Sequence, residues 1–254
     1  LRSKRLQSKK RKTLLYKYGG IVGVVFTVVG GLAFLSHIDA AKVTAVEVSG
    51  SKIVPRATLE ALASNALGDR FLGIFSRNNM VLYPRSEVEE EITEQFKAIA
   101  AATASFDGFH TLKVTVHELE PKYLWCDSLE RERCYFMDMH GYIFSESAEF
   151  SQNILFTFYG LVDPLAPVGK NYMEPNVFNE LVSFVQSVRV LDLEPIGLLV
   201  GDDGVGDFTL LLEDGGKVLF SNREPYLTVY ENLEAVAHEQ KRIDPSFVHR
   251  LDYI

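Results

Sequence analysis

The amino-acid sequence predicts an α+β protein with a single N-terminal transmembrane helix, a small βααββ domain and a mixed, mainly antiparallel β domain with helices. Residues 18–38 contain no Asp, Glu, Lys or Arg. Further along, strand, helix, helix, strand and strand patterns follow one another, and after Pro121 the chain reads as short strands interrupted by two helices. The 254 residues therefore divide into a basic tail (1–17), a transmembrane helix (18–38), a first domain (40–120) and a second domain (121–254).

Charge is distributed very unevenly along the chain. The tail holds eight cations and no acid, and the first acid is Asp39, so the remainder holds 18 cations against 34 anions. Cations before an apolar run of about 20 residues predict a cytoplasmic N-terminus and an extracytoplasmic body in a single-pass cell-membrane protein. An acidic body also argues against nucleic acid as a partner. The alternative is a cleaved signal peptide, but the run exceeds the usual core of about 7–15 residues, and Ile38-Asp39-Ala40 is a poor cleavage site.

Small residues recur at every fourth position of the predicted transmembrane helix. They are Gly19, Gly23, Thr27 and Gly31. Such a ridge allows close contact between two membrane helices. The alternative is that glycine is simply common in membrane helices.

The first domain follows from local periodicity. Residues 43–48 alternate as a half-buried strand, and a helix begins near Pro55 and ends at Gly68. Residues 86–96 read as a second amphipathic helix. Two strands then flank the turn at Asp107-Gly108, at residues 100–106 and 112–118.

The second domain is predicted from hairpin and helix signals. Strands at 134–137 and 142–144 flank a turn, and the strands 207–212 and 217–221 pair around Asp214-Gly215-Gly216. Another strand is expected at 196–200. Helices are expected over 176–190, with Asn176 as N-cap, and over 225–240.

The order of these parts resembles the FtsQ/DivIB family of bacterial cell-division proteins. The segment from Val46 to Gly50, followed by Val54-Pro55, resembles the start of that family's POTRA domain. Residues 116–121, leading to Trp125, resemble the passage into its β domain, and residues 134–144 resemble a hairpin of that domain. The resemblance implies a non-enzymatic scaffold of the divisome that acts in septum formation. It would sit in the membrane bilayer and recruit single-span proteins of the FtsB and FtsL type.

The sequence departs from the family pattern at two places. Leu119 and Glu120-Pro121 match the family's E-R-x-P passage only in part. The last residues resemble the start of the final family strand, so the β domain is expected to be truncated there; they are Leu251, Asp252, Tyr253 and Ile254. In the family this strand offers its edge to FtsB and FtsL, which would be β-augmentation. The alternative is an ordinary internal or frayed terminal strand.

Two cysteines flank a seven-residue charged link, Asp127 to Arg133. The sequence leaves three alternatives open for Cys126 and Cys134: a disulfide, two free thiols, or a zinc site with His117 or His140.

Catalytic motifs find little support in the sequence. Neither H-E-x-x-H nor G-x-S-x-G occurs. Ser51-Lys52 fits a turn better than a serine–lysine dyad, and Gly201 to Asp207 fits a solvated loop better than a calcium site. We therefore expect no catalytic, cofactor-binding or metal-binding residue and no small-molecule substrate. The alternatives to the scaffold are a membrane-anchored extracytoplasmic peptidase or cell-wall hydrolase, and a tethered POTRA-type chaperone.

Overall fold

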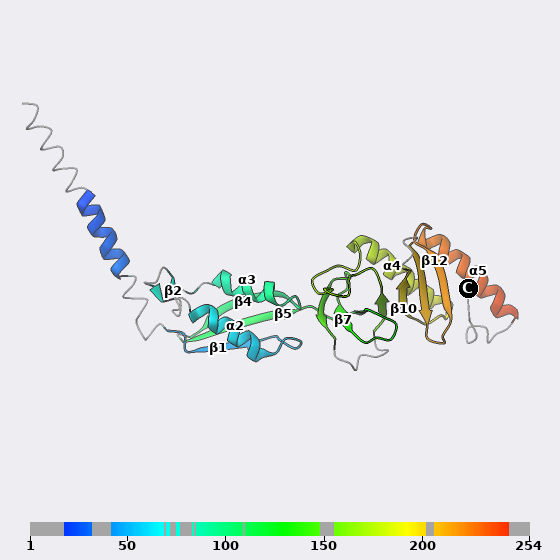
Figure 1. The fold of residues 1–254 in the computed structure, drawn as a ribbon, viewed down its shortest axis with the longest axis horizontal. Coiled ribbons are helices and arrows are strands. Elements are labelled where there is room, and N and C mark those ends of the chain that lie inside the picture. Colours follow the sequence, from blue (N-terminus) through cyan, green and yellow to red (C-terminus); the bar gives the residue numbers. More distant parts are fainter. Residues whose placement is uncertain are drawn as a thin grey trace, which may run out of the picture. The chain divides into compact units, whose positions relative to one another are not determined.

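The chain divides into two compact units, residues 1–118 and 119–254. Its structure, a computed structural model, has α+β architecture with two mixed sheets (Figure 1). Each unit is described by itself. The described residues are 18–31, 42–68, 70–71, 75–76, 83, 85–108, 110–147, 155–201 and 206–243.

The predicted transmembrane helix is not supported, and the predicted fold class is wrong in this respect. Within the described ranges, the helices all fall short of the length and apolar character that crossing a bilayer requires. Within the predicted span, the structure describes a helix at residues 18–31. The remainder of the predicted span, residues 32–38, lies outside the described residues.

Unit 1 has the predicted order of strand, helix, helix, strand and strand. Its three-stranded sheet has the order β1-β5-β4, with β1 parallel and β4 antiparallel to β5. A two-stranded hairpin, β2–β3, lies between the helices and was not predicted from the sequence. The elements are β1 (Ala45–Ser49), α2 (Arg56–Gly68), β2 (Arg70–Phe71), β3 (Phe75–Ser76), α3 (Arg85–Gln95), β4 (Ile99–Asp107) and β5 (Thr111–Glu118).

The core of unit 1 forms where the apolar stripes of the two helices meet the central strand. Leu59 and Ala63 of α2 and Ile92 of α3 are fully buried, as are Leu112 and Val114 of β5. The i, i+4 spacing of Leu59 and Ala63 places both on one helix face, which explains why this segment packs as a helix.

Unit 2 contains a seven-stranded sheet of order β12-β11-β10-β9-β6-β7-β8. The strand β9 runs parallel to both of its neighbours, β6 and β10, while the outer pairs are antiparallel. The strands are β6 (Tyr123–Cys126), β7 (Cys134–Met137), β8 (Ile143–Glu146), β9 (Thr157–Tyr159), β10 (Pro195–Val200), β11 (Asp207–Leu212) and β12 (Lys217–Ser221).

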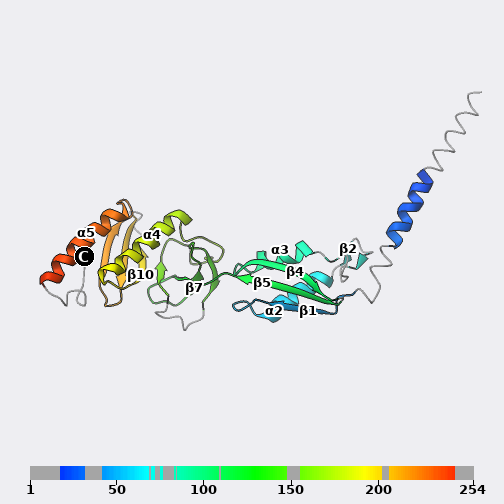
Figure 2. The ribbon, with the colours of Figure 1, turned by 180° about the vertical axis from the view of Figure 1, so that it is seen from behind.

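Two helices and a short 3-10 turn complete unit 2. They are α4 (Pro175–Val188), η2 (Arg189–Leu191) and α5 (Tyr226–Ile243). The N-cap of α4 is Glu174 and not the predicted Asn176, because the Glu174 carboxylate accepts the backbone N–H groups of Asn176 and Val177. The helices α4 and α5 lie against each other and pack on the strands (Figure 2).

An aromatic cluster fills the core of unit 2 under α4. Phe158 and Phe178 are fully buried with ring centroids 5.1 Å apart, and Tyr123 and Tyr172 pack against both. Burial raises the pKa of Tyr172, whose hydroxyl donates to the Tyr159 carbonyl at 3.0 Å. This cluster holds the start of α4 against the centre of the sheet.

Candidate functional site: an open sheet edge

At one edge of the seven-stranded sheet, backbone pairing covers the first residue of β8 and the turn before it. The N–H of Ile143 donates to the carbonyl of Lys170 at 2.9 Å, and the N–H of Gly169 donates to the carbonyl of Ile143 at 2.8 Å. The N–H of Tyr172 reaches the carbonyl of Gly141 at 2.8 Å. The loop that follows β9 therefore covers the first residues of this edge, where an unpaired strand would attract other chains.

The turn at Gly141 makes this closure possible. Gly141 has φ of 83°, and a Cβ there would stand 3.0 Å from the Phe178 ring. The Asp138 carboxylate accepts the N–H groups of His140 and Tyr142, which fixes the turn. Only a residue without a side chain fits between the turn and the aromatic core.

The opposite edge, at β12, has no such cover among the described residues. The N–H of Leu212 donates to the carbonyl of Gly216, and the N–H of Asn222 donates to the carbonyl of Gly206. These two bonds show which residue pairs of the β11–β12 ladder are hydrogen-bonded and which are not. In an antiparallel ladder the intervening pairs turn their backbone groups outward. The N–H and C=O of Leu219 therefore point away from β11, and no described residue pairs with them.

A groove of about 300 Å³ runs beside this open edge. Val218 and Phe220 of β12 are buried beneath it, and Leu219 is 48% exposed. The other wall comes from α5 and is mostly apolar: Val229, Asn232, Leu233 and Val236. An unpaired strand edge next to apolar pockets is the arrangement that binds an extended peptide as an added strand.

In unit 1, side chains cap the outer edge of β4. The Tyr83 hydroxyl donates to the Ala104 carbonyl at 3.0 Å, and the Ala104 N–H donates to the Glu89 carboxylate at 2.8 Å. Arg85 holds Glu89 through a hydrogen bond of 2.9 Å. Burial raises the pKa of Glu89, but the Ala104 N–H and the Arg85 guanidinium together lower it by more than burial raises it. The pKa of Glu89 therefore lies below its ordinary value.

The outer edge of β1 also lacks a strand partner among the described residues. Its neighbouring groove, of about 480 Å³, includes Glu60 and Ser64 of α2 in its lining. The lining of this groove is more polar than that of the groove beside β12.

Cys126 and Cys134 form a disulfide between paired positions of β6 and β7. Neither cysteine is therefore a free thiol or a zinc ligand, and no cluster of metal-binding side chains occurs within the described ranges. The enclosed loop is tied further by an Asp127–Arg133 ion pair at 2.9 Å and by Arg131, which donates to the Tyr159 hydroxyl.

Ser51 and Lys52 do not form a dyad. The hydroxyl of Ser51 is buried and has no hydrogen-bond partner, while Lys52 contributes its backbone N–H to the Glu118 carboxylate. The same carboxylate accepts the N–H groups of Ile53 and Val54. It thereby fixes the turn that leads into α2, and Gly50, with φ of 91°, lies too close to Val116 to carry a side chain.

The remaining predicted site residues are not brought together with this edge. Gly19, Gly23, Thr27 and Gly31 lie on the helix at 18–31, where the Thr27 hydroxyl donates to the Gly23 carbonyl at 2.9 Å. Leu251, Asp252, Tyr253 and Ile254 lie outside the described residues, as does most of the loop from Gly201 to Asp207.

Leu219 was not among the site residues predicted from the sequence. The strand at residues 217–221 was predicted correctly, and the available sequence signal was a third apolar residue, Leu219, between Val218 and Phe220. That signal does not tell an edge strand from an internal one, which depends on pairing with distant segments. No protein-family model matches the chain, and a search of curated proteins finds no relative.

Proposed function

We propose that this chain is a non-enzymatic scaffold of bacterial cell division that recruits other division proteins through its extracytoplasmic units. The observation that supports it most is the open β12 edge beside the apolar groove of α5. A partner segment entering as an extended strand would pair with the outward N–H and C=O of Leu219. Its alternate side chains would enter the groove.

The Cys126–Cys134 disulfide supports placement outside the cytoplasm. Disulfides persist in oxidising compartments and are rare where glutathione keeps thiols reduced. The partner class, small single-span proteins of the FtsB and FtsL type, rests on the resemblance of the order of elements to the FtsQ/DivIB family.

The proposal is tested by changing the backbone of the edge without changing the ladder. In Leu219→Pro the outward N–H is lost, while every hydrogen bond to β11 stays, because proline is tolerated where the N–H faces outward. Leu219→Ala is the matched control, since it shortens the side chain and keeps the N–H. The full chain is co-expressed with the FtsB and FtsL homologues of the same cell, and the complex is purified through a tag.

We expect the unchanged protein and Leu219→Ala to recover the partners and Leu219→Pro to lose them. Recovery by Leu219→Pro at the level of the unchanged protein would contradict docking at this edge. Hydrolysis of peptidoglycan or peptides by the purified chain, abolished by Ser51→Ala, would contradict the non-enzymatic assignment.

A further inference from the structure

A second groove lies between α4 and α5, on residues that the β12 groove does not use. Its volume is about 710 Å³, against about 300 Å³ beside β12. The two helices that form it are visible side by side in Figure 2. Four residues of its lining come from α5 and the turn before it: Pro225, Tyr226, Leu227 and Tyr230. The other five come from α4: Asn179, Glu180, Ser183, Phe184 and Ser187.

The floor of this groove is aromatic and held in place from below. The Phe184 and Tyr226 rings stack with centroids 5.4 Å apart and planes within 18°. Phe184 also packs on Phe220, which belongs to the sheet, at 4.9 Å. Leu227 stands at the rim and is 68% exposed. The groove therefore presents apolar surface that is already ordered, so a ligand need not order it on binding.

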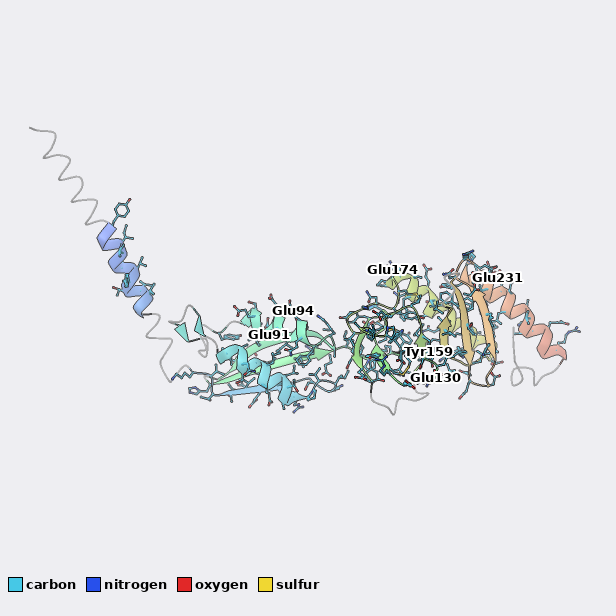
Figure 3. The ribbon with its side chains drawn as sticks, in the orientation of Figure 1. Glu91, Glu94, Glu130, Tyr159, Glu174 and Glu231 are labelled. Carbon is cyan, nitrogen blue, oxygen red and sulfur yellow. A yellow bond between two sulfur atoms is a disulfide. The ribbon has the colours of Figure 1, made fainter. Side chains whose placement is uncertain are left out.

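One carboxylate lines the groove, and two more follow its lining residue Tyr230 along α5. Glu180 lies on α4, and Glu231 and Glu234 follow Tyr230 on α5; Figure 3 labels Glu231 there and Glu174 at the start of α4. None of Glu180, Glu231 and Glu234 is in an ion pair with another described residue. Burial raises the pKa of the Tyr226 hydroxyl, and the negative charge of Glu180 raises it further, so this carboxylate acts on the floor of the groove. A cationic ligand would therefore be favoured.

The spacing on both helices favours a helical ligand. Leu227, Tyr230, Glu231 and Glu234 stand at i, i+3, i+4 and i+7 on α5, which forms one stripe. The lining of this groove comes from two helices and the turn before α5, and no strand of the sheet lines it, so an added strand would find no sheet edge to pair with here. A helix brings its own backbone hydrogen bonds and needs only apolar contact and charge from its site.

We propose that the α4–α5 groove binds a basic amphipathic helix of a partner protein. Apolar side chains at i, i+3 or i+4, and i+7 would pack on Phe184, Tyr226 and Leu227. Flanking Lys or Arg side chains would pair with Glu180, Glu231 and Glu234. This site goes beyond the proposed function, because it is separate from the β12 edge and takes a helix in place of a strand.

The test uses the full chain and three labelled synthetic peptides, followed by fluorescence anisotropy. The first is an amphipathic helix with Leu at core positions and Lys on both flanks. The second replaces each Lys by Glu, and the third is a proline-rich peptide with the same number of Lys residues. We expect the basic helix to bind and the other two to bind at least about tenfold more weakly.

Leu227→Asp distinguishes binding in the groove from nonspecific electrostatic attraction between a basic peptide and an acidic protein. It adds negative charge and removes an apolar anchor, so the proposal predicts affinity at least about tenfold lower, whereas general attraction predicts higher affinity. Leu165→Asp adds the same charge at a distant, 87% exposed loop position and is expected to leave binding unchanged. Glu231→Lys is expected to weaken the basic helix and strengthen the acidic one.

Two outcomes would overturn the proposal. One is unchanged or tighter binding of the basic helix to Leu227→Asp. The other is a groove that prefers a different occupant. This occupant would be the proline-rich peptide, if it binds more tightly than the basic helix, or a second copy of the chain, if the protein forms a dimer that Leu227→Asp dissociates. Leu219→Pro is expected to leave peptide binding unchanged, so failure here and failure of the β12 edge are distinguishable.

Discussion

The two edges of the seven-stranded sheet are treated in opposite ways. At β8 the loop after β9 returns along the strand, and Gly169, Lys170 and Tyr172 pair with the backbone of Gly141 and Ile143. At β12 no described residue meets the outward groups of Leu219, and an apolar groove lies beside them. A sheet edge invites pairing with another chain, and proteins usually cover it. Among the described residues, β12 is the edge without such cover, which is why we propose it as the docking edge.

Unit 1 shows an intermediate solution at β4. There side chains cap Ala104: the Tyr83 hydroxyl donates to its carbonyl, and the Glu89 carboxylate accepts its N–H. The returning loop at β8 pairs with two residues, Gly141 and Ile143, whereas the side chains at β4 cap one residue, and one of these caps is a carboxylate.

The largest expected effect comes from a proline at Val218 of β12, where the backbone N–H points toward β11. Val218→Pro removes a hydrogen bond to β11 and a buried side chain, so we expect unit 2 to lose about 3 kcal/mol of stability. Leu219→Pro is expected to cost less than about 1 kcal/mol, because its N–H has no partner to lose. Urea unfolding followed by the fluorescence of Trp125, the only tryptophan, reports on unit 2. Equal losses in the two variants would show that the edge assignment is wrong.

The disulfide sharpens the comparison at the closed side, because β7 is the neighbour of β8. Removing it with Cys126→Ala and Cys134→Ala is expected to cost about 2–3 kcal/mol, the loop-closure entropy of so short a loop. Hydrogen exchange is expected to speed up more at the amides of Ile143 and Gly169 than at Val218. Dithiothreitol should reproduce the loss in the unchanged protein and have no effect on the double variant.

The smallest expected effect is at the capped edge of β4. Glu89→Gln keeps an acceptor for the Ala104 N–H but loses the charge, so exchange of that amide is expected to be about fivefold faster at neutral pH. The pKa of Glu89 is lower in the folded state than in the unfolded state. The ionised carboxylate therefore stabilises the fold fully above its ordinary pKa of about 4.3, and this stabilisation is lost as the pH falls through the pKa of the folded state.

The control for this cap is Glu91→Gln, an exposed carboxylate on the same helix (Figure 3). It changes the charge of α3 equally and leaves Ala104 untouched. A protection loss of the same size in both variants would attribute the effect to helix charge and not to the cap.

Local sequence signals determined most of the secondary structure. Asp214-Gly215-Gly216 predicted the β11–β12 hairpin with both strand bounds as observed, and Pro55 and Gly68 marked the ends of α2. These signals succeed because the period of a helix or strand and the needs of a turn are written within about ten neighbouring residues. The absence of charge over 18–38 was a weaker guide, since it says nothing of helix length.

Tertiary structure alone decided which edge is closed, which cysteine state is adopted and which residue caps α4. The closure of β8 depends on Lys170 meeting Ile143, and the turn before α2 depends on Glu118 meeting Lys52, from opposite ends of unit 1. Such contacts have no local periodicity, because they arise only when folding brings distant segments together. The candidate docking edge is of this kind: the sequence by itself determined that residues 217–221 form a strand, and strand pairing decided that this strand lies at the edge.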